Sequence, residues 1–190
     1  MAVTRFACLC IGLWAFSVPA DTADLDRVLA ALAQRQHSHA TFTERQYLAL
    51  LERPLESSGE VFYDAPDRFE KRTLAPRRES LLLDHGTLTM QRGRRRHMLD
   101  LNQYPQLLPF VESIRATLAG DRGALERLFE LEFEGRLERW TLRLTPRDKP
   151  FSRVVSEIRI AGEAAALRTI EIRQTDGDRS MMTLDENVAP

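Results

Sequence analysis

The sequence has little cysteine and almost no lysine. Its two cysteines, Cys8 and Cys10, lie within the first twenty residues, so the chain that follows this segment has no thiol. That excludes disulfides, thiolate metal ligands and a cysteine nucleophile there. Lys71 and Lys149 are the only lysines, and the remaining positive charge is arginine. With a formal net charge of −1, the chain has no overall field that would attract nucleic acid or an anionic membrane.

The short motifs of common catalytic sites are also missing. The sequence has no serine in a glycine-flanked elbow and no phosphate-binding glycine loop. Its acidic residues mostly alternate with apolar ones, as on a solvent-exposed strand face. His37 and His39 could share a metal ion, but two ligands without a third make a poor site. We therefore predict no catalytic residue, no metal site and no cofactor.

An apolar segment opens the chain. Arg5 precedes an apolar run over 6–16, and small residues follow up to Ala20. This order is typical of a secretory signal peptide. The run is shorter than the roughly 20 residues that cross a bilayer. We predict cleavage near Ala20, which leaves 21–190 as a single domain of the size that buries a core.

Three segments have the spacing of amphipathic helices. The first is predicted over 24–36, where Leu25, Val28, Leu29 and Leu32 fall on one face. The second is predicted over 106–119 and ends at Gly120, a residue that commonly terminates helices. The third is a short helix over 121–128 with Asp121 as its N-cap.

Most of the remaining chain alternates between apolar and polar residues. Strands are predicted over 41–51, 60–63, 68–74, 79–84, 87–91 and 96–101, with Ser57-Ser58-Gly59 in a turn. Further strands contain the alternating apolar sets Phe129/Leu131/Phe133, Trp140/Leu142/Leu144, Ile158/Ile160 and Ile170/Ile172. Alternation places the apolar side chains on one face and the charges on the other. The pattern predicts an antiparallel meander with one apolar and one wet face.

A single sheet must cover its apolar face, and three short helices are little cover for so many strands. A closed barrel would pack solid or hold one small ligand, whereas a curled, half-open sheet would leave a concave apolar surface. We predict an α+β, mainly β fold: an incomplete antiparallel β-barrel of about ten or eleven strands, with the helices as a lid over an apolar cavity. A solid core is the competing interpretation.

The order of these elements resembles the LolA-type family of outer-membrane lipoprotein carriers. The segments that carry the resemblance are SHATFTERQ over 38–46, SGEVFYDAPDRF over 58–69, SLLLDHGTL over 80–88, LAGD over 118–121 and LRLTP over 142–146. The resemblance implies an incomplete barrel that shields acyl chains without catalysis or cofactor. It also implies a periplasmic protein that takes a lipoprotein or lipid from an inner-membrane transporter and delivers it to an outer-membrane receptor. We expect it to be a monomer.

Two positions depart from the family pattern. The residue before the strand-turn proline is typically arginine, and an aromatic residue commonly stands two places after the phenylalanine; here these residues are Ala65 and Lys71. In the family the arginine helps to hold the lid closed. The departures predict a divergent relative, and they leave open whether its cargo is a lipoprotein or another hydrophobic molecule.

Alternation and the resemblance together give a set of candidate ligand-binding residues. The predicted cavity is lined by Val61, Tyr63, Phe69, Leu81, Leu83, Leu88, Trp140, Leu142, Ile158, Ile160, Ile170 and Ile172. Leu107, Val111 and Ile114 are predicted to line the lid. Arg94, Arg95 and Arg96 form the densest basic run, which is either a solvated hairpin turn or a contact for lipid phosphates or an acidic partner.

The leading functional hypothesis is thus a periplasmic acyl-chain carrier. Two alternatives belong to other classes. A lipid-sensing or scaffold module would use the same sheet without transport, and a lipid-processing enzyme would need a polar residue whose substitution abolishes turnover. Identification of a bound lipid would support the first hypothesis, whereas an unliganded protein that takes up no fatty acid would leave the scaffold module.

Overall fold

The computed structural model describes residues 20–104 and 108–186. This part of the chain forms a single sheet of eleven strands, with four α-helices and one 3-10 turn. The strands are β1 (His37–Tyr47), β2 (Leu55–Asp64), β3 (Arg68–Ala75), β4 (Glu79–Asp84), β5 (Thr87–Arg92), β6 (Arg95–Asp100), β7 (Phe129–Arg136), β8 (Arg139–Pro146), β9 (Val155–Glu163), β10 (Ala166–Gln174) and β11 (Arg179–Asp185). The helices are α1 (Ala20–Ala33), α2 (Leu108–Leu118), α3 (Arg122–Leu128) and α4 (Lys149–Ser152), and the 3-10 turn is Leu101–Gln103.

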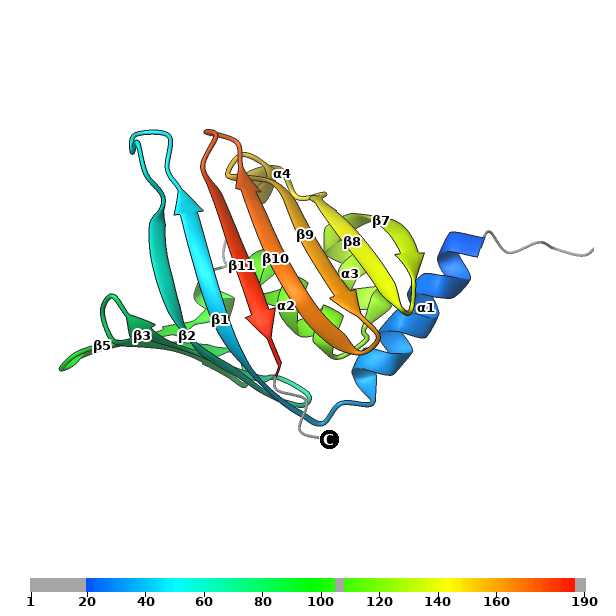
Figure 1. Cartoon of the computed structure of the whole chain (residues 1–190), viewed down its shortest axis with the longest axis horizontal. Helices are drawn as coiled ribbons and strands as arrows, with labels where there is room; N and C mark the ends of the chain where they lie inside the picture. The colour runs from blue at the N-terminus through cyan, green and yellow to red at the C-terminus, as the bar shows by residue number, and fades with distance from the viewer. Residues whose placement is uncertain (1–19, 105–107, 187–190) are drawn as a thin grey trace, which may run out of the picture.

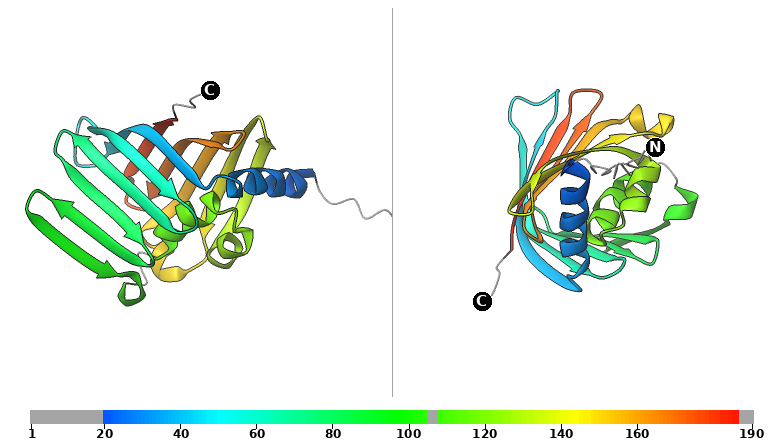
Figure 2. Two further views of the ribbon diagram at one scale, coloured as in Figure 1. Left: turned by 90° about the horizontal axis from the view of Figure 1, so that it is seen from below. Right: turned by 90° about the vertical axis from the view of Figure 1, so that its right-hand side faces the viewer.

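The sheet is antiparallel and open. Its strand order is β6-β5-β4-β3-β2-β1-β11-β10-β9-β8-β7, so β6 and β7 are its two edges. The sheet curls, and helices α2 and α3 lie within its concave side, with α1 along the end near β7 (Figures 1 and 2). The segment that joins the two edge strands contains α2 and α3. The predicted mainly-β, incomplete-barrel fold is therefore confirmed.

The concave face of one half of the sheet is packed against the helices. Leu25, Val28, Leu29 and Leu32 of α1 are buried in a core with residues of α3 and of β1, β2 and β7–β11. A second, smaller cluster consists of Leu83, Leu88 and Leu101, with Val111 of α2 packed against it. We call strands β3–β6 the wing, because they extend away from the helices at the other end of the sheet (Figure 1).

The convex face carries paired charges. Arg143 on β8 lies 2.6 Å from Glu132 on β7 and 3.2 Å from Glu157 on β9. These contacts run across neighbouring strands, as expected for the polar face of an alternating sheet. Among the described residues, no helix is both long and apolar enough to cross a membrane.

Several predicted boundaries were wrong. The first helix ends at Ala33 and β1 already starts at His37, which pairs with Asp64 of β2. The predicted turn at Ser57-Ser58-Gly59 lies within β2, because Gly59 has no side chain to collide with the backbone of Arg72 on β3. Helix α4 was not predicted, and Asp148 caps it by accepting a hydrogen bond from the Phe151 amide. Residues 1–19 of the predicted leader and Leu107 of the predicted lid lie outside the described residues.

Candidate ligand-binding trough

Two hollows flank the helices on the concave side of the sheet. The first, which we call the α4 hollow, has a volume of about 520 Å³. It is lined by Glu44, Gln46, Leu48, Lys71, Phe110, Pro150, Phe151, Val154, Val155, Ile172, Gln174, Arg179 and Ser180. Seven of these residues are apolar, including Phe110 of α2 and Phe151 of α4, and six are polar or charged.

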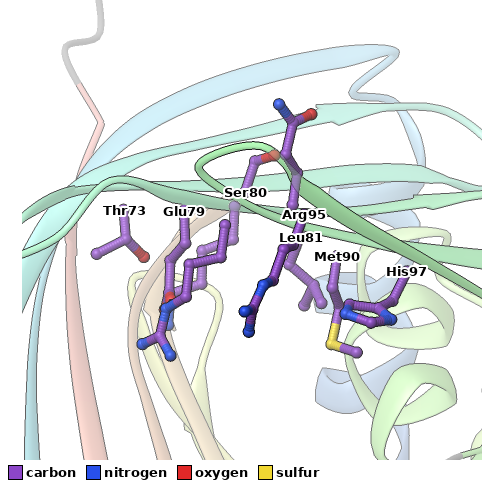
Figure 3. A pocket seen from close by; sticks show the side chains of 10 residues that line it. Thr73, Glu79, Ser80, Leu81, Met90, Arg95 and His97 are labelled. Atoms are coloured by element: carbon purple, nitrogen blue, oxygen red, sulfur yellow. The ribbon is translucent and has the colours of Figure 1, made fainter.

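The second hollow lies on the wing and has a volume of about 450 Å³. It is lined by Lys71, Thr73, Glu79, Ser80, Leu81, Met90, Gln91, Arg92, Arg95 and His97. Figure 3 shows Leu81, Met90, Arg95 and His97 projecting from the same side of the wing. We call this the wing hollow. Both hollows fall within the range of about 300–1,000 Å³ that is usual for small-molecule sites, and we call the two hollows together the trough.

Lys71 lines both hollows and forms an ion pair between them. Its Nζ lies 2.6 Å from Oε2 of Glu44, which also accepts a hydrogen bond from the Ser57 hydroxyl at 3.3 Å. The Ser180 hydroxyl donates to the other oxygen of Glu44 at 2.7 Å. Lys71 also lies over the ring of Phe42, 4.9 Å from its centre. Both carboxylate oxygens of Glu44 therefore accept hydrogen bonds, although Glu44 lies on the apolar face of β1.

The surroundings of Glu44 favour its charged form. Burial by itself raises the pKa of this carboxyl, because it penalises the charge. The positive charge of Lys71 and the hydrogen bonds from Lys71 and Ser180 outweigh burial, so the pKa of Glu44 lies below its ordinary value. The pair therefore places fixed charges between the two hollows.

Little space remains directly beneath the lid. The cavity there measures about 30 Å³, which is far smaller than either hollow. Of the predicted cavity residues, Val61, Tyr63, Phe69 and Ile170 line this remnant. Trp140, Leu142, Ile158 and Ile160 are fully buried in the main core, and Leu83 and Leu88 are buried in the smaller cluster. Leu81 lines the wing hollow and Ile172 lines the α4 hollow.

The predicted lid residues of α2 face the sheet. Ile114 lines the remnant cavity beneath the lid, and Val111 packs against the smaller cluster. Arg115 of the same helix bonds within the lid: its guanidinium group donates to Glu112 at 2.7 Å and lies 3.7 Å from Asp121. Ala65 stands before Pro66, where the family typically has arginine. Its amide donates a hydrogen bond to the carbonyl of Gln36 at 2.8 Å.

The basic run divides between the two faces of the wing. Arg94 lies in the turn before β6, and Arg95 lines the wing hollow. Arg96 follows Arg95 along β6 and therefore points to the opposite face. Of the three predicted contacts, the structure brings Arg95 into the trough beside His97 and Met90, two residues that the sequence reasoning missed.

The sequence analysis also did not predict the Glu44–Lys71 pair at the centre of the trough. Glu44 follows Ala40 and Phe42 at alternate positions of β1, and all three are buried. The sequence did contain a signal for this pair: a charged residue at a position where alternation predicts an apolar one. Lys71 gives the same signal on β3, where it lies between Phe69 and Thr73 on one face. His37 and His39 lie on the other face of the sheet: His37 bonds to Asp64 at 2.9 Å and His39 stacks on Phe62. Within the described residues, no group of three or more potential metal ligands occurs.

Comparison with known proteins identifies one family. The model of the family described as "Outer membrane lipoprotein carrier protein LolA-like" matches residues 17–189. No curated protein matches the chain in sequence.

Solved structures match over about nine-tenths of the chain. A DUF1329 family protein from Desulfovibrio piger has a TM-score of 0.50 at 9% identity, covering 90% of this chain and 94% of its own. LolA superfamily protein NE2245 from Nitrosomonas europaea has a TM-score of 0.44 at 10% identity, with 87% and 91% covered. The Pseudomonas aeruginosa MucA/MucB complex gives 0.48 at 17% identity, where 90% of this chain spans 58% of the matched chain. Likeness at these identities concerns the fold.

Proposed function

Because this chain belongs to the LolA-like family of outer membrane lipoprotein carrier proteins, we propose that it carries a lipoprotein or another lipid through the periplasm by holding its acyl chain in the trough. The observation that carries this proposal is apolar surface on the concave face that no helix covers. Met90 is 39% exposed and Val154 is 55% exposed, and both line hollows beside the lid.

Burial of a hydrocarbon chain supplies the binding energy. Each buried methylene contributes about 0.8 kcal/mol, and the α4 hollow offers Phe110, Phe151 and Ile172 as apolar partners. A carrier must also release its cargo, so the lid has to exchange between closed and open arrangements. Ile114 and Leu118 of α2 occupy the space beneath the lid, and movement of α2 away from the sheet would join this space to the hollows.

The proposed route follows from the family. The chain is exported, its leader is cleaved near Ala20, and the domain 21–190 acts as a monomer without a cofactor. It accepts cargo from an inner-membrane transporter and gives it to an outer-membrane receptor. Its role is binding rather than catalysis.

Native mass spectrometry of protein expressed with its leader tests this proposal. The expected result is a discrete added mass that organic extraction identifies as a lipid or lipopeptide. The same experiment reports the mass of the chain and so tests cleavage near Ala20. An unliganded mass together with no uptake of a fluorescent fatty acid would contradict the carrier function. That outcome would favour a scaffold module, while turnover of the lipid would favour an enzyme.

A further inference from the structure

The concave face of the wing changes from apolar to cationic between the lid and the rim. Cross-strand pairing aligns its side chains in three rows that run over β3, β4, β5 and β6. The row nearest the lid is Phe69, Leu83, Leu88 and Leu99. The middle row is Lys71, Leu81, Met90 and His97. The outer row is Thr73, Glu79, Arg92 and Arg95.

The first two rows have different roles in packing. Leu83 and Leu88 are buried against Leu101, so the row nearest the lid stabilises the wing. In the middle row Leu81 is half-buried and Met90 is 39% exposed. These two side chains form an apolar floor that lies open within the wing hollow (Figure 3).

Positive charge is in excess around this floor. Lys71 is paired with Glu44 at 2.6 Å, and Arg92 is paired with Glu79 at 3.2 Å. Arg95 has no carboxylate oxygen of any described residue within 4.0 Å. Three permanent cations thus face two carboxylates, and the excess lies at the rim. A guanidinium group binds a phosphate or carboxylate through two parallel hydrogen bonds.

A simpler role for these arginines is protection of an edge strand. Charged side chains on an edge strand and at its end discourage pairing with another chain, and Arg94, Arg95 and Arg96 would serve this role alike. It does not account for the exposed apolar floor on the face of Arg95. The combination of an open apolar floor with a cationic rim fits a molecule that has an apolar chain and an anionic head.

We propose that the wing hollow binds the anionic headgroup, a phosphate or a carboxylate, of an amphiphile. The headgroup contacts Arg95 and Arg92, and the chain runs over Met90 and Leu81 and past Lys71 toward the α4 hollow. This inference rests on the proposed acyl-chain function and names the class of cargo: an anionic amphiphile.

Four ligands with the same alkyl chain test the headgroup. Dodecyl phosphate, dodecanoate, dodecanol and dodecyltrimethylammonium are titrated by calorimetry below the concentrations at which they form micelles. At least one of the two anions is expected to bind about tenfold more tightly than dodecanol, since each hydrogen bond to a charged group contributes about 1.4 kcal/mol or more. The anion that binds more tightly shows whether the natural ligand is a phosphate-bearing lipid or a free fatty acid.

Two adjacent arginines provide a matched pair of variants. Arg95→Gln is expected to lower the affinity for the preferred anion about tenfold and to leave dodecanol binding unchanged. Arg96→Gln, on the opposite face of the same strand, is expected to change both affinities by less than about twofold. Equal losses in the two variants, or anions that bind no more tightly than dodecanol, would overturn the headgroup site. If all four ligands fail to bind, the acyl-chain function fails as well.

Discussion

Glu44 shows how a polar side chain can be accommodated on an apolar sheet face. Its carboxylate accepts hydrogen bonds from Lys71, Ser57 and Ser180. Such a group stabilises the fold only while its partners remain, because removal of one partner leaves the other buried and unpaired. The pair thus combines a structural requirement with a polar position in the middle of the trough.

We predict that Glu44→Gln destabilises the protein by about 1–3 kcal/mol, because the Lys71 ammonium group loses its carboxylate. Lys71 retains some solvent contact, since 20% of its side chain is exposed, and this keeps the loss below that of a fully buried pair. Urea unfolding followed by circular dichroism measures the change. Glu56→Gln is the matched control on β2, because the Glu56–Arg45 pair is exposed and is expected to contribute less than about 1 kcal/mol. Equal effects would contradict the prediction.

The same residue predicts a dependence on pH. The pKa of Glu44 in the folded protein lies below its ordinary value of 4.5. A lowered pKa contributes stability above the unfolded-state pKa, and that contribution disappears as the pH falls through the folded-state value. The difference in unfolding free energy between the wild type and Glu44→Gln should therefore be constant at pH values well above 4.5 and shrink as the pH falls through the lowered folded-state pKa. A difference that grows as the pH falls would have the wrong sign.

Val154 allows a test of ligand binding without disturbing the core. It lines the α4 hollow and is 55% exposed, so Val154→Asp should leave stability nearly unchanged. A carboxylate there would have to lose water against a bound chain, and we expect the affinity for a fluorescent fatty acid to fall about tenfold. Leu50→Asp is the control, since Leu50 is 97% exposed and lies outside the hollows described above. A similar loss in both variants would exclude the α4 hollow as the binding site.

At the scale of secondary-structure elements, Gly120 lies where the chain leaving α2 comes into close contact with α1. It follows α2 with a φ of +67°, and a Cβ atom there would lie 2.8 Å from Cβ of Ala33 and still closer to the carbonyl oxygen of Leu29, both in α1. The close approach of α1 and α2 therefore requires glycine at this position. The helical pattern of the sequence indicated a helix end at Gly120, whereas the contact with α1 became visible only in the fold.

Gly120→Ala is expected to destabilise the protein by at least about 2 kcal/mol, from backbone strain and from the collision with α1. Gly86→Ala separates the two causes. Gly86 has a similar φ of +76°, but a Cβ atom added there would meet no other atom within 4 Å, so it reports strain alone, at about 1 kcal/mol. Thermal and urea unfolding of both variants measures the difference. Equal losses would mean that the contact with α1 contributes nothing.

Strand alternation was sufficient to predict the architecture. The period-two patterns in β8, β9 and β10 identified the apolar face, because these strands pack on the core over their whole length. Strand ends were less predictable. Ser57-Ser58-Gly59 has the composition of a turn, yet its backbone pairs with β1, since cross-strand hydrogen bonds and the close approach to Arg72 override local preference.

The trough was less predictable than the sheet. Alternation assigns a face to each residue but does not say how far a helix covers that face. Trp140 and Leu81 therefore had equal status in the sequence, although the first is fully buried and the second lines an open hollow. Arg95 and Arg96 were likewise indistinguishable within a basic run until the start of β6 fixed the phase of its side chains.

For the whole molecule, burial is distributed unevenly along one continuous sheet. The main core includes buried residues from α1 and α3 and from strands β7–β11, whereas the wing is supported by three buried leucines. Local opening requires less free energy where fewer apolar contacts are lost. The wing should therefore open without the rest of the sheet, which would give an amphiphile access to the trough.

We expect hydrogen exchange to be at least about a hundredfold faster in β5 and β6 than in β8–β10. Strand β7 is the internal control, because it is the other edge of the sheet but has Phe129 fully buried against the helices. If edge position alone determined exchange, β6 and β7 would exchange equally fast; if burial determines it, β7 will be slower. The anion that binds more tightly, dodecyl phosphate or dodecanoate, should then slow exchange selectively in β5 and β6. Uniform protection across both edges would instead mean that the sheet opens as one unit, and the lid alone would have to admit the cargo.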